Sequence, residues 1–111
     1  MLKSRPGDAM WCLVMFDLPV LTKAQRREAT QFRKLLVDSG YSMVQYSVYG
    51  KYSPTVHSNN TIEKFIRANI PAYGEVRIFH LTDNQWASAV RFVSRRKAKS
   101  EEAPEQFKLF A

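Results

Sequence analysis

The sequence is short of the residues that build most metal and redox sites. Only one of its 111 residues is a cysteine and two are histidines, so the chain cannot form an internal disulfide and shows no Cys/His spacing typical of zinc. Phosphate-binding P-loops, glycine-rich dinucleotide motifs and nucleophile elbows are also absent. The single Cys12 lies inside an apolar run, which indicates a buried, unreactive thiol in a reducing cytoplasm.

Long apolar segments are missing as well. The apolar run from Met10 to Phe16 is far shorter than the roughly 20 residues that span a bilayer. The polar start MLKSRPGDAM does not have the pattern of a signal peptide. We therefore expect a cytoplasmic protein without a membrane partner.

Acidic residues are outnumbered by basic ones. The chain has 17 lysines and arginines against 10 acids, a formal net charge of +7, which favours nucleic acid as the partner. Its length predicts one domain. Because a domain this small buries a limited share of its surface, leftover apolar edges favour a dimer.

Hydrophobic patterning predicts the order β-α-β-β-α-β. The expected strands and helices are strand 10–17, helix 22–39, two short strands within 41–52 broken near 45–47, helix 55–69, strand 74–82, one turn at 83–87 and a short final strand at 89–93. Thr22 and Gln25 have the spacing of a capping box, and Gly40 is placed as a left-handed helix stop.

This order is typical of the α+β, ferredoxin-like βαββαβ two-layer sandwich, here with an additional C-terminal strand. We divide the chain into an N-terminal arm (1–9), the ferredoxin-like domain (10–94) and a basic linker with a C-terminal tail (95–111).

Asp17 is the candidate for chemistry, because it ends the apolar first strand and is fixed by the sheet behind it. It can either cap backbone amides of the Asp-Leu-Pro turn or hold a metal ion. One carboxylate is a sparse Mg²⁺ site, and a dimer axis that brings both copies of Asp17 together would complete it. Such an ion can polarise a phosphoryl group or activate water.

Two basic clusters are candidates for phosphate contacts. The first shares one face of the predicted helix 22–39 and comprises Lys23, Arg26, Arg27, Arg33 and Lys34. The second follows the last predicted strand and comprises Arg91, Arg95, Arg96, Lys97 and Lys99. Each is either a solvated surface or a contact to a nucleic-acid backbone, and the latter would be blind to sequence and steeply dependent on salt.

Histidine and tyrosine give weaker signals. His80 lies in a predicted strand, where packing or a hydrogen bond is more usual than metal binding, and His57 lies in a polar stretch. The tyrosines Tyr41, Tyr46, Tyr49 and Tyr52 could stack bases as in the RRM module. The RRM signature is missing, so core or dimer packing is the favoured interpretation. Asp83 is expected to cap a turn.

The motifs F-D-L-P-V, R-R…F-R-K and Q-Y-S-V-Y, in this order over residues 10–93, closely resemble the smaller of the two universal CRISPR-associated adaptation proteins, in its type II form. The resemblance implies a metal-dependent endoribonuclease and a dimer at the core of the spacer-acquisition integrase. In that complex the dimer sits between two dimers of the larger adaptation protein and holds the double-stranded DNA prespacer.

The same resemblance implies roles for single residues. Asp17 matches the aspartate assigned to a divalent metal, usually Mg²⁺, and Ser47 matches a small polar residue in the hairpin turn. The family's basic residues match Arg26, Arg27, Arg33 and Lys34. The apolar tail residues Phe107, Leu109 and Phe110 would bind the partner or the other protomer by strand addition.

Three functions therefore compete. The first is a subunit that dimerises, binds duplex DNA and scaffolds the larger integrase subunit. The second is a Mg²⁺-dependent phosphodiesterase with Asp17 as metal ligand. The third is a toxin-like ribonuclease or a non-catalytic module of the same fold that binds single-stranded RNA.

Overall fold

The computed structural model describes residues 10–54, 56–94 and 96–97, and within them the side chains of 56–60 and 96–97 are not described. The elements are β1 (Met10–Asp17), α1 (Lys23–Asp38), β2 (Ser42–Gln45), β3 (Val48–Ser53), α2 (Val56–Arg67), β4 (Glu75–Thr82), α3 (Asp83–Ala87), β5 (Phe92–Val93) and β6 (Arg96–Lys97). The predicted arm and the tail residues Phe107, Leu109 and Phe110 lie outside the described residues.

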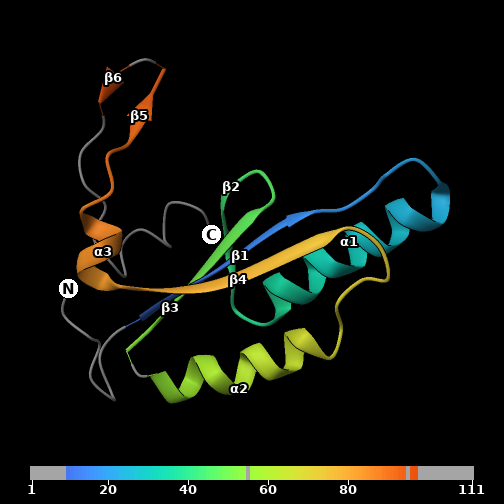
Figure 1. The fold of residues 1–111 in the computed structure, drawn as a ribbon, viewed down its shortest axis with the longest axis horizontal. Coiled ribbons are helices and arrows are strands. Elements are labelled where there is room, and N and C mark those ends of the chain that lie inside the picture. Colours follow the sequence, from blue (N-terminus) through green and yellow to red (C-terminus); the bar gives the residue numbers. More distant parts are fainter. Residues whose placement is uncertain (1–9, 55, 95, 98–111) are drawn as a thin grey trace.

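Four strands form one antiparallel sheet in the order β2-β3-β1-β4. The helices α1 and α2 both lie on one face of this sheet (Figure 1). Because β1 and β4 are neighbours although two helices and two strands separate them in the chain, the predicted ferredoxin-like α+β sandwich is confirmed. Within the described residues no helix has the length and apolar character to cross a membrane.

Local signals set the ends of α1. The Thr22 hydroxyl accepts a hydrogen bond from the Gln25 backbone N–H at 3.1 Å, and Gln25 Oε1 accepts one from the Thr22 N–H at 3.0 Å. This is the predicted capping box. After α1 the chain turns through Gly40, whose φ of 94° lies in the left-handed region, as predicted.

The core lies between the sheet and the two long helices, because alternate residues of β1 face the helices. It is formed by Cys12, Val14, Phe16, Phe32, Leu36, Tyr41, Tyr49 and Ile66. Cys12 is fully buried and accepts a hydrogen bond from the Tyr41 hydroxyl at 3.0 Å. Burial raises the pKa of the Cys12 thiol, so the buried thiol predicted from the sequence is confirmed and the thiolate is disfavoured.

The opposite face of the sheet, which we call the open face, is partly covered by α3. Trp86 of α3 stacks on Trp11 of β1 with ring centroids 4.2 Å apart, and the Trp11 indole N–H donates to Asp83 Oδ1 at 3.2 Å. Asp83 was expected to cap this turn, and that prediction is wrong. Thr82 is the N-cap, in a capping box with Gln85, and Asp83 instead accepts the tryptophan hydrogen bond.

The final strand also differs from expectation. Only Phe92–Val93 is extended, and it pairs with Arg96–Lys97 in a separate two-stranded hairpin rather than with the main sheet. The chain leaves β4 directly into α3, which packs on the open face through the stacking of Trp86 on Trp11, and Ser94 (φ 51°) lies in the turn after β5.

Candidate functional site

Asp17 is the last residue of β1 and its side chain is exposed on the open face. The neighbouring Phe16 points to the helices, so the alternation of the strand directs Asp17 away from them. In the antiparallel ladder of β1 and β4, Asp17 is directly opposite Glu75. Residues paired in this way lie on the same face, so the fold brings a second carboxylate beside the predicted one.

Gly74 allows this close approach of the two strands. Its φ is 96°, and a Cβ at this position would lie 2.5 Å from the Asp17 carbonyl oxygen and 3.0 Å from Leu18 Cα. No side chain fits between the backbones at such distances, and an L-residue would also be strained at this φ. Gly74 therefore helps to fix the position of Glu75 against Asp17.

Both acids line a shallow cleft of about 360 Å³, which we call the Asp17 cleft. Its lining comprises Met15, Phe16, Asp17, Tyr46, Ser47, Val48, Glu75 and Arg77. These residues come from the end of β1, the β2–β3 turn and the start of β4, which meet at one end of the sheet (Figure 1). The guanidinium of Arg77 contacts Glu75 Oε1 at 2.9 Å, but both side chains are about 70% exposed, so this ion pair adds little stability.

The β2–β3 turn is fixed to β1 through its backbone. Ser47 has a φ of 62°, uncommon for a residue other than glycine, and its carbonyl accepts a hydrogen bond from the Phe16 N–H at 3.1 Å. The resemblance matched Ser47 to a small polar residue in the hairpin turn, and the structure shows that its backbone carbonyl joins this turn to the residue before Asp17. The predicted break near 45–47 is confirmed.

The cationic residues of α1 differ in their contacts. Lys23, Arg26, Arg27 and Lys34 are all exposed. The guanidinium of Arg26 donates to the carbonyls of Val20 and Leu21, at 3.1 and 3.2 Å, and so braces the turn between β1 and α1.

Arg33 is half-buried and lies between two aromatic rings, with its Cζ 5.7 Å from the Phe16 centroid and 5.6 Å from the Tyr46 centroid. The structure describes only part of the second basic cluster. Arg91 is half-buried, the side chain of Arg96 is not described, and Arg95 lies outside the described residues.

His80 has a structural role. Its Nε2 lies 3.1 Å from Glu63 Oε1, which joins β4 to α2, and Glu63 also lies 3.7 Å from Arg67. The prediction of a hydrogen-bonded histidine is confirmed.

His57 lies in the first turn of α2 and not in a loop. Among the residues that the structure describes, no group of three or more His, Cys, Asp or Glu side chains could hold a metal.

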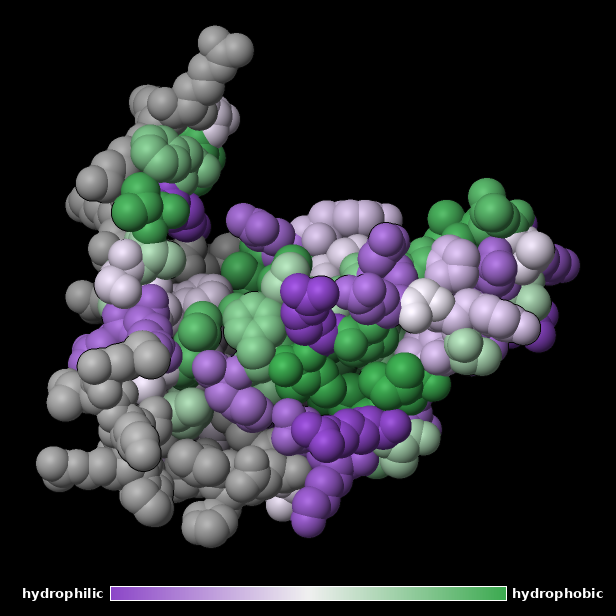
Figure 2. All heavy atoms as spheres, viewed as in Figure 1, coloured by the Kyte–Doolittle hydropathy of each residue, from purple (hydrophilic) through white to green (hydrophobic). Residues whose placement is uncertain are grey.

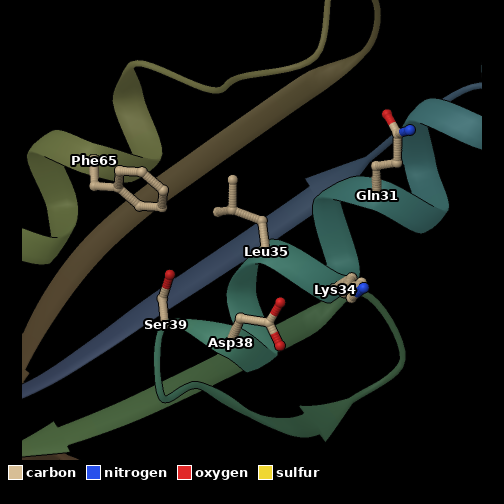
Figure 3. Close-up of a pocket in the computed structure, with 6 residues that line it drawn as sticks. All are labelled: Gln31, Lys34, Leu35, Asp38, Ser39 and Phe65. Carbon is tan, nitrogen blue, oxygen red and sulfur yellow. The ribbon is translucent and has the colours of Figure 1, made fainter.

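A second depression, of about 450 Å³, lies between α1 and α2 on the far side of the sheet from Asp17. Figure 3 shows Phe65 of α2 and Leu35 of α1 projecting toward each other across it, with Asp38 and Ser39 at its lower end. Figure 2 shows apolar atoms gathered between these helices. This depression has an apolar floor and no pair of acids, so the candidate chemistry remains at Asp17.

Sequence reasoning missed Gly74, Glu75 and Arg77, because no motif contains them. The one signal in the sequence was that these residues begin the predicted strand 74–82. In the predicted sheet this strand must lie beside another strand, but the sequence does not show which residues are then opposite each other. Tyr46 was considered only as one of several similar tyrosines. The structure separates them, since Tyr41 and Tyr49 are 2% and 6% exposed whereas Tyr46 is 82% exposed.

Comparison with known proteins gives a consistent result. The family model for CRISPR associated protein Cas2 matches residues 10–89. The CRISPR-associated endoribonuclease Cas2 of Paracidovorax avenae is 44% identical over 101 residues, covering 91% of this chain and 94% of that protein. The protein of the same name from Parvibaculum lavamentivorans is 37% identical and covers 91% and 100% of the two chains. The crystal structure of Streptococcus pyogenes Cas2 superposes with a TM-score of 0.56 at 27% identity, over 76% of this chain and 99% of that one.

Proposed function

Because this chain belongs to the Cas2 family of CRISPR-associated proteins, we propose that it is a dimeric subunit that binds duplex DNA and scaffolds the larger integrase subunit during spacer acquisition. The observation that carries this proposal is the exposed cationic face of α1. Lys23, Arg27 and Lys34 are exposed there, and within the described part of the chain none of them forms an ion pair. Exposed cations without carboxylate partners are suited to neutralise phosphates.

The open face supports the dimer. A groove of about 420 Å³ runs between Leu13, Val44 and Val48 of the sheet and the segment from Ala89 to Val93. Val90 and Phe92 in that segment are 66% and 63% exposed, and Figure 2 shows apolar atoms on the projection that this part of the chain forms. A second copy of the chain would cover these surfaces and gain apolar burial. The tail with Phe107, Leu109 and Phe110 would remain available to dock the larger subunit.

Paired charge reversals test duplex binding. We expect Lys23→Glu with Arg27→Glu to weaken binding to double-stranded DNA by at least tenfold at low salt. The slope of log affinity against log salt should fall by about one for each phosphate that the variant no longer neutralises. Lys64→Glu with Arg67→Glu is the matched control, because it makes the same charge change on α2. Equally weakened binding in both variants would show a response to net charge alone and would overturn the assignment to α1.

The second candidate is a Mg²⁺-dependent endoribonuclease, the activity in the names of the relatives, and the pairing of Asp17 with Glu75 favours it specifically. The two carboxylates fit Mg²⁺, which binds one or two protein carboxylates and fills its shell with water and substrate phosphate oxygens. When bound, the ion would supply charge to polarise a phosphoryl group or to activate water. Asp17 and Glu75 would hold it, and Arg77 would neutralise a substrate phosphate beside them.

Asp17→Asn on rigorously purified protein tests the nuclease. We expect loss of Mg²⁺-dependent cleavage of single-stranded RNA with unchanged affinity for duplex DNA. Asp38→Asn, which removes an exposed acid elsewhere on the surface, should leave both unchanged. Cleavage by Asp17→Asn at the rate of the original protein would assign the activity to another site or to a contaminant. Co-purification with the larger adaptation subunit separates either function from a toxin-like ribonuclease or a solitary RNA-binding module.

A further inference from the structure

We propose that Val20 and Leu21, which we call the apolar tip, insert into the minor groove of double-stranded DNA and partly unstack one base step. The inference rests on the proposed function and extends it, because it adds a bend in the bound duplex to the contacts with its phosphates. The observations that support it are the exposure of the tip, the hydrogen bonds that hold it and the cations beside it.

The apolar tip is exposed to a degree that folding does not explain. Leu21 is 87% exposed, the highest fraction among the large hydrophobic side chains that the structure describes, and Val20 is 50% exposed. Both lie in the segment between β1 and α1, which Figure 1 shows at one end of the molecule. The two side chains therefore add little to the core, and apolar surface in solvent gains free energy when a partner covers it.

The backbone of the tip is held by two side chains of α1. The Leu21 N–H donates to Gln25 Oε1 at 3.0 Å. Arg26 Nη1 donates to the carbonyls of Val20 and Leu21 at 3.1 and 3.2 Å, and Pro19 restricts the backbone immediately before them. Because the tip is already ordered, its insertion between base pairs would lose less conformational entropy than the insertion of a free loop.

Cations lie beside the tip. The guanidinium of Arg26 contacts the two carbonyls through Nη1 alone, so its other N–H groups can reach a phosphate. Lys23 precedes Arg26 by three positions and Arg27 by four, so these exposed side chains are neighbours on the helix surface. The first turn of α1 contains no acid. An apolar projection with arginine and lysine at its base is typical of proteins that insert a wedge into the minor groove.

The size of the tip favours the minor groove over the major groove. The minor groove is about 6 Å wide, which admits a two-residue turn but not the helix that follows, whereas the major groove accepts a whole helix. A leucine inserted there would partly separate two base pairs and bend the duplex toward the major groove. Pyrimidine–purine steps such as TA would yield most readily, because they are the most easily unstacked.

The test uses two blunt DNA duplexes that differ only in the central step, TA in one and AT in the other. In each, 2-aminopurine replaces the adenine of that step and a dye is attached at both ends. The original protein should raise the 2-aminopurine fluorescence of the TA duplex, because unstacking removes quenching. It should also increase energy transfer between the dyes, because a bend brings the two ends closer.

Leu21→Ala should abolish both signals. We expect it to weaken binding of the TA duplex by about tenfold, the loss expected when roughly half of the burial of a leucine side chain is removed. Binding of the stiffer AT duplex should change by less than about twofold. Leu21→Met should retain the affinity and both signals, since methionine also serves as a wedge between base pairs.

Val37→Ala is the matched control, because Val37 is 55% exposed on α1 but lies near the other end of that helix. Thermal unfolding of each variant verifies that the fold is retained. If the original protein binds neither duplex, the proposed function fails and the inference fails with it. If it binds both duplexes without a change in either signal, or if Leu21→Ala gives the same signals, the wedge alone is overturned.

A protein partner for the tip would give a different result. Leu21→Ala would then lose co-purification with the larger subunit while its duplex binding and unstacking stayed unchanged. That outcome would assign the tip to a protein interface and would also overturn the proposal.

Discussion

Asp17 and Glu75 are directly opposite each other in the ladder of β1 and β4, although 57 positions of the sequence lie between them. Like charges placed in this way destabilise an antiparallel pair. Arg77, which contacts Glu75 at 2.9 Å, relieves only part of the repulsion because its guanidinium is exposed. A divalent cation beside both carboxylates would remove the repulsion more fully.

Mg²⁺ should therefore raise the unfolding temperature. At a concentration ten times the dissociation constant the gain is about 1.4 kcal/mol, or roughly 5 °C for a domain of this size. Excess EDTA should reverse the shift in a thermal-shift assay. Asp17→Asn and Glu75→Gln should each reduce it, whereas Asp38→Asn should not. A shift of the same size in all variants would place the ion elsewhere.

Replacement of Gly74 should damage both the fold and the site. Gly74→Ala combines the strain of a positive φ with a Cβ placed 2.5 Å from the Asp17 carbonyl oxygen, and we expect a loss of about 2–4 kcal/mol in the free energy of unfolding. Gly40→Ala is a matched control, because its φ is 94° but its Cβ would meet the flexible Lys51 side chain. It should cost about 1 kcal/mol. Equal losses in urea unfolding would show that the close approach to Asp17 has no influence.

Stability should fall at alkaline pH. Burial raises the pKa of both Cys12 and Tyr41 above their ordinary values of 9.0 and 10.0. The native state therefore retains protons that the unfolded chain releases, and the associated stability is complete below pH 9 and declines as the pH rises above it. Each group contributes at most about 1.4 kcal/mol per pH unit in that range.

Urea unfolding at pH 7.5, 9.5 and 10.5 measures this decline. Tyr41→Phe should cost about 1 kcal/mol at pH 7.5, because the hydrogen bond to Cys12 is removed, and should then lose less stability than the original protein above pH 9.5. A variant with the same alkaline slope as the original protein would show that Tyr41 does not contribute to it.

The contact between Trp11 and Trp86 should hold α3 on the open face. Trp86→Ala removes a stacked ring at 4.2 Å and leaves the buried Trp11 exposed, so we expect a loss of about 2–4 kcal/mol and a red shift of tryptophan emission. Trp86→Phe retains an aromatic partner and should lose less than half as much. Unfolding followed by fluorescence and circular dichroism gives both values. An unshifted emission maximum in Trp86→Ala would indicate that α3 does not shield Trp11.

The parts of the fold that were predictable are those with local signals. Thr22 and Gln25 mark the start of α1, Gly40 follows its end, and the apolar run before Asp17 marks the central strand. Each signal is contained within a few residues, so it can be recognised without the rest of the chain.

The site was less predictable because it depends on register. Glu75 is beside Asp17 because β4 pairs with β1 in one particular alignment, and shifting that alignment by one residue would turn Glu75 to the helices. Likewise, the packing of α3 on the open face depends on the stacking of Trp86 on Trp11, which lies 75 positions earlier in the sequence. Such relations between distant residues have no local pattern. Asp17 as a metal ligand and the cations of α1 as phosphate contacts remain predictions that the experiments above would test.

The burial of Cys12 has a practical consequence. It is the only cysteine in the chain, and in the native state its sulfur is enclosed by the core and bonded to Tyr41. A cysteine introduced at a surface position would then be the single thiol open to maleimide reagents. Fluorescent dyes or spin labels could therefore be attached at one chosen point without first removing the native residue, and distances between labels on two copies would test the proposed dimer.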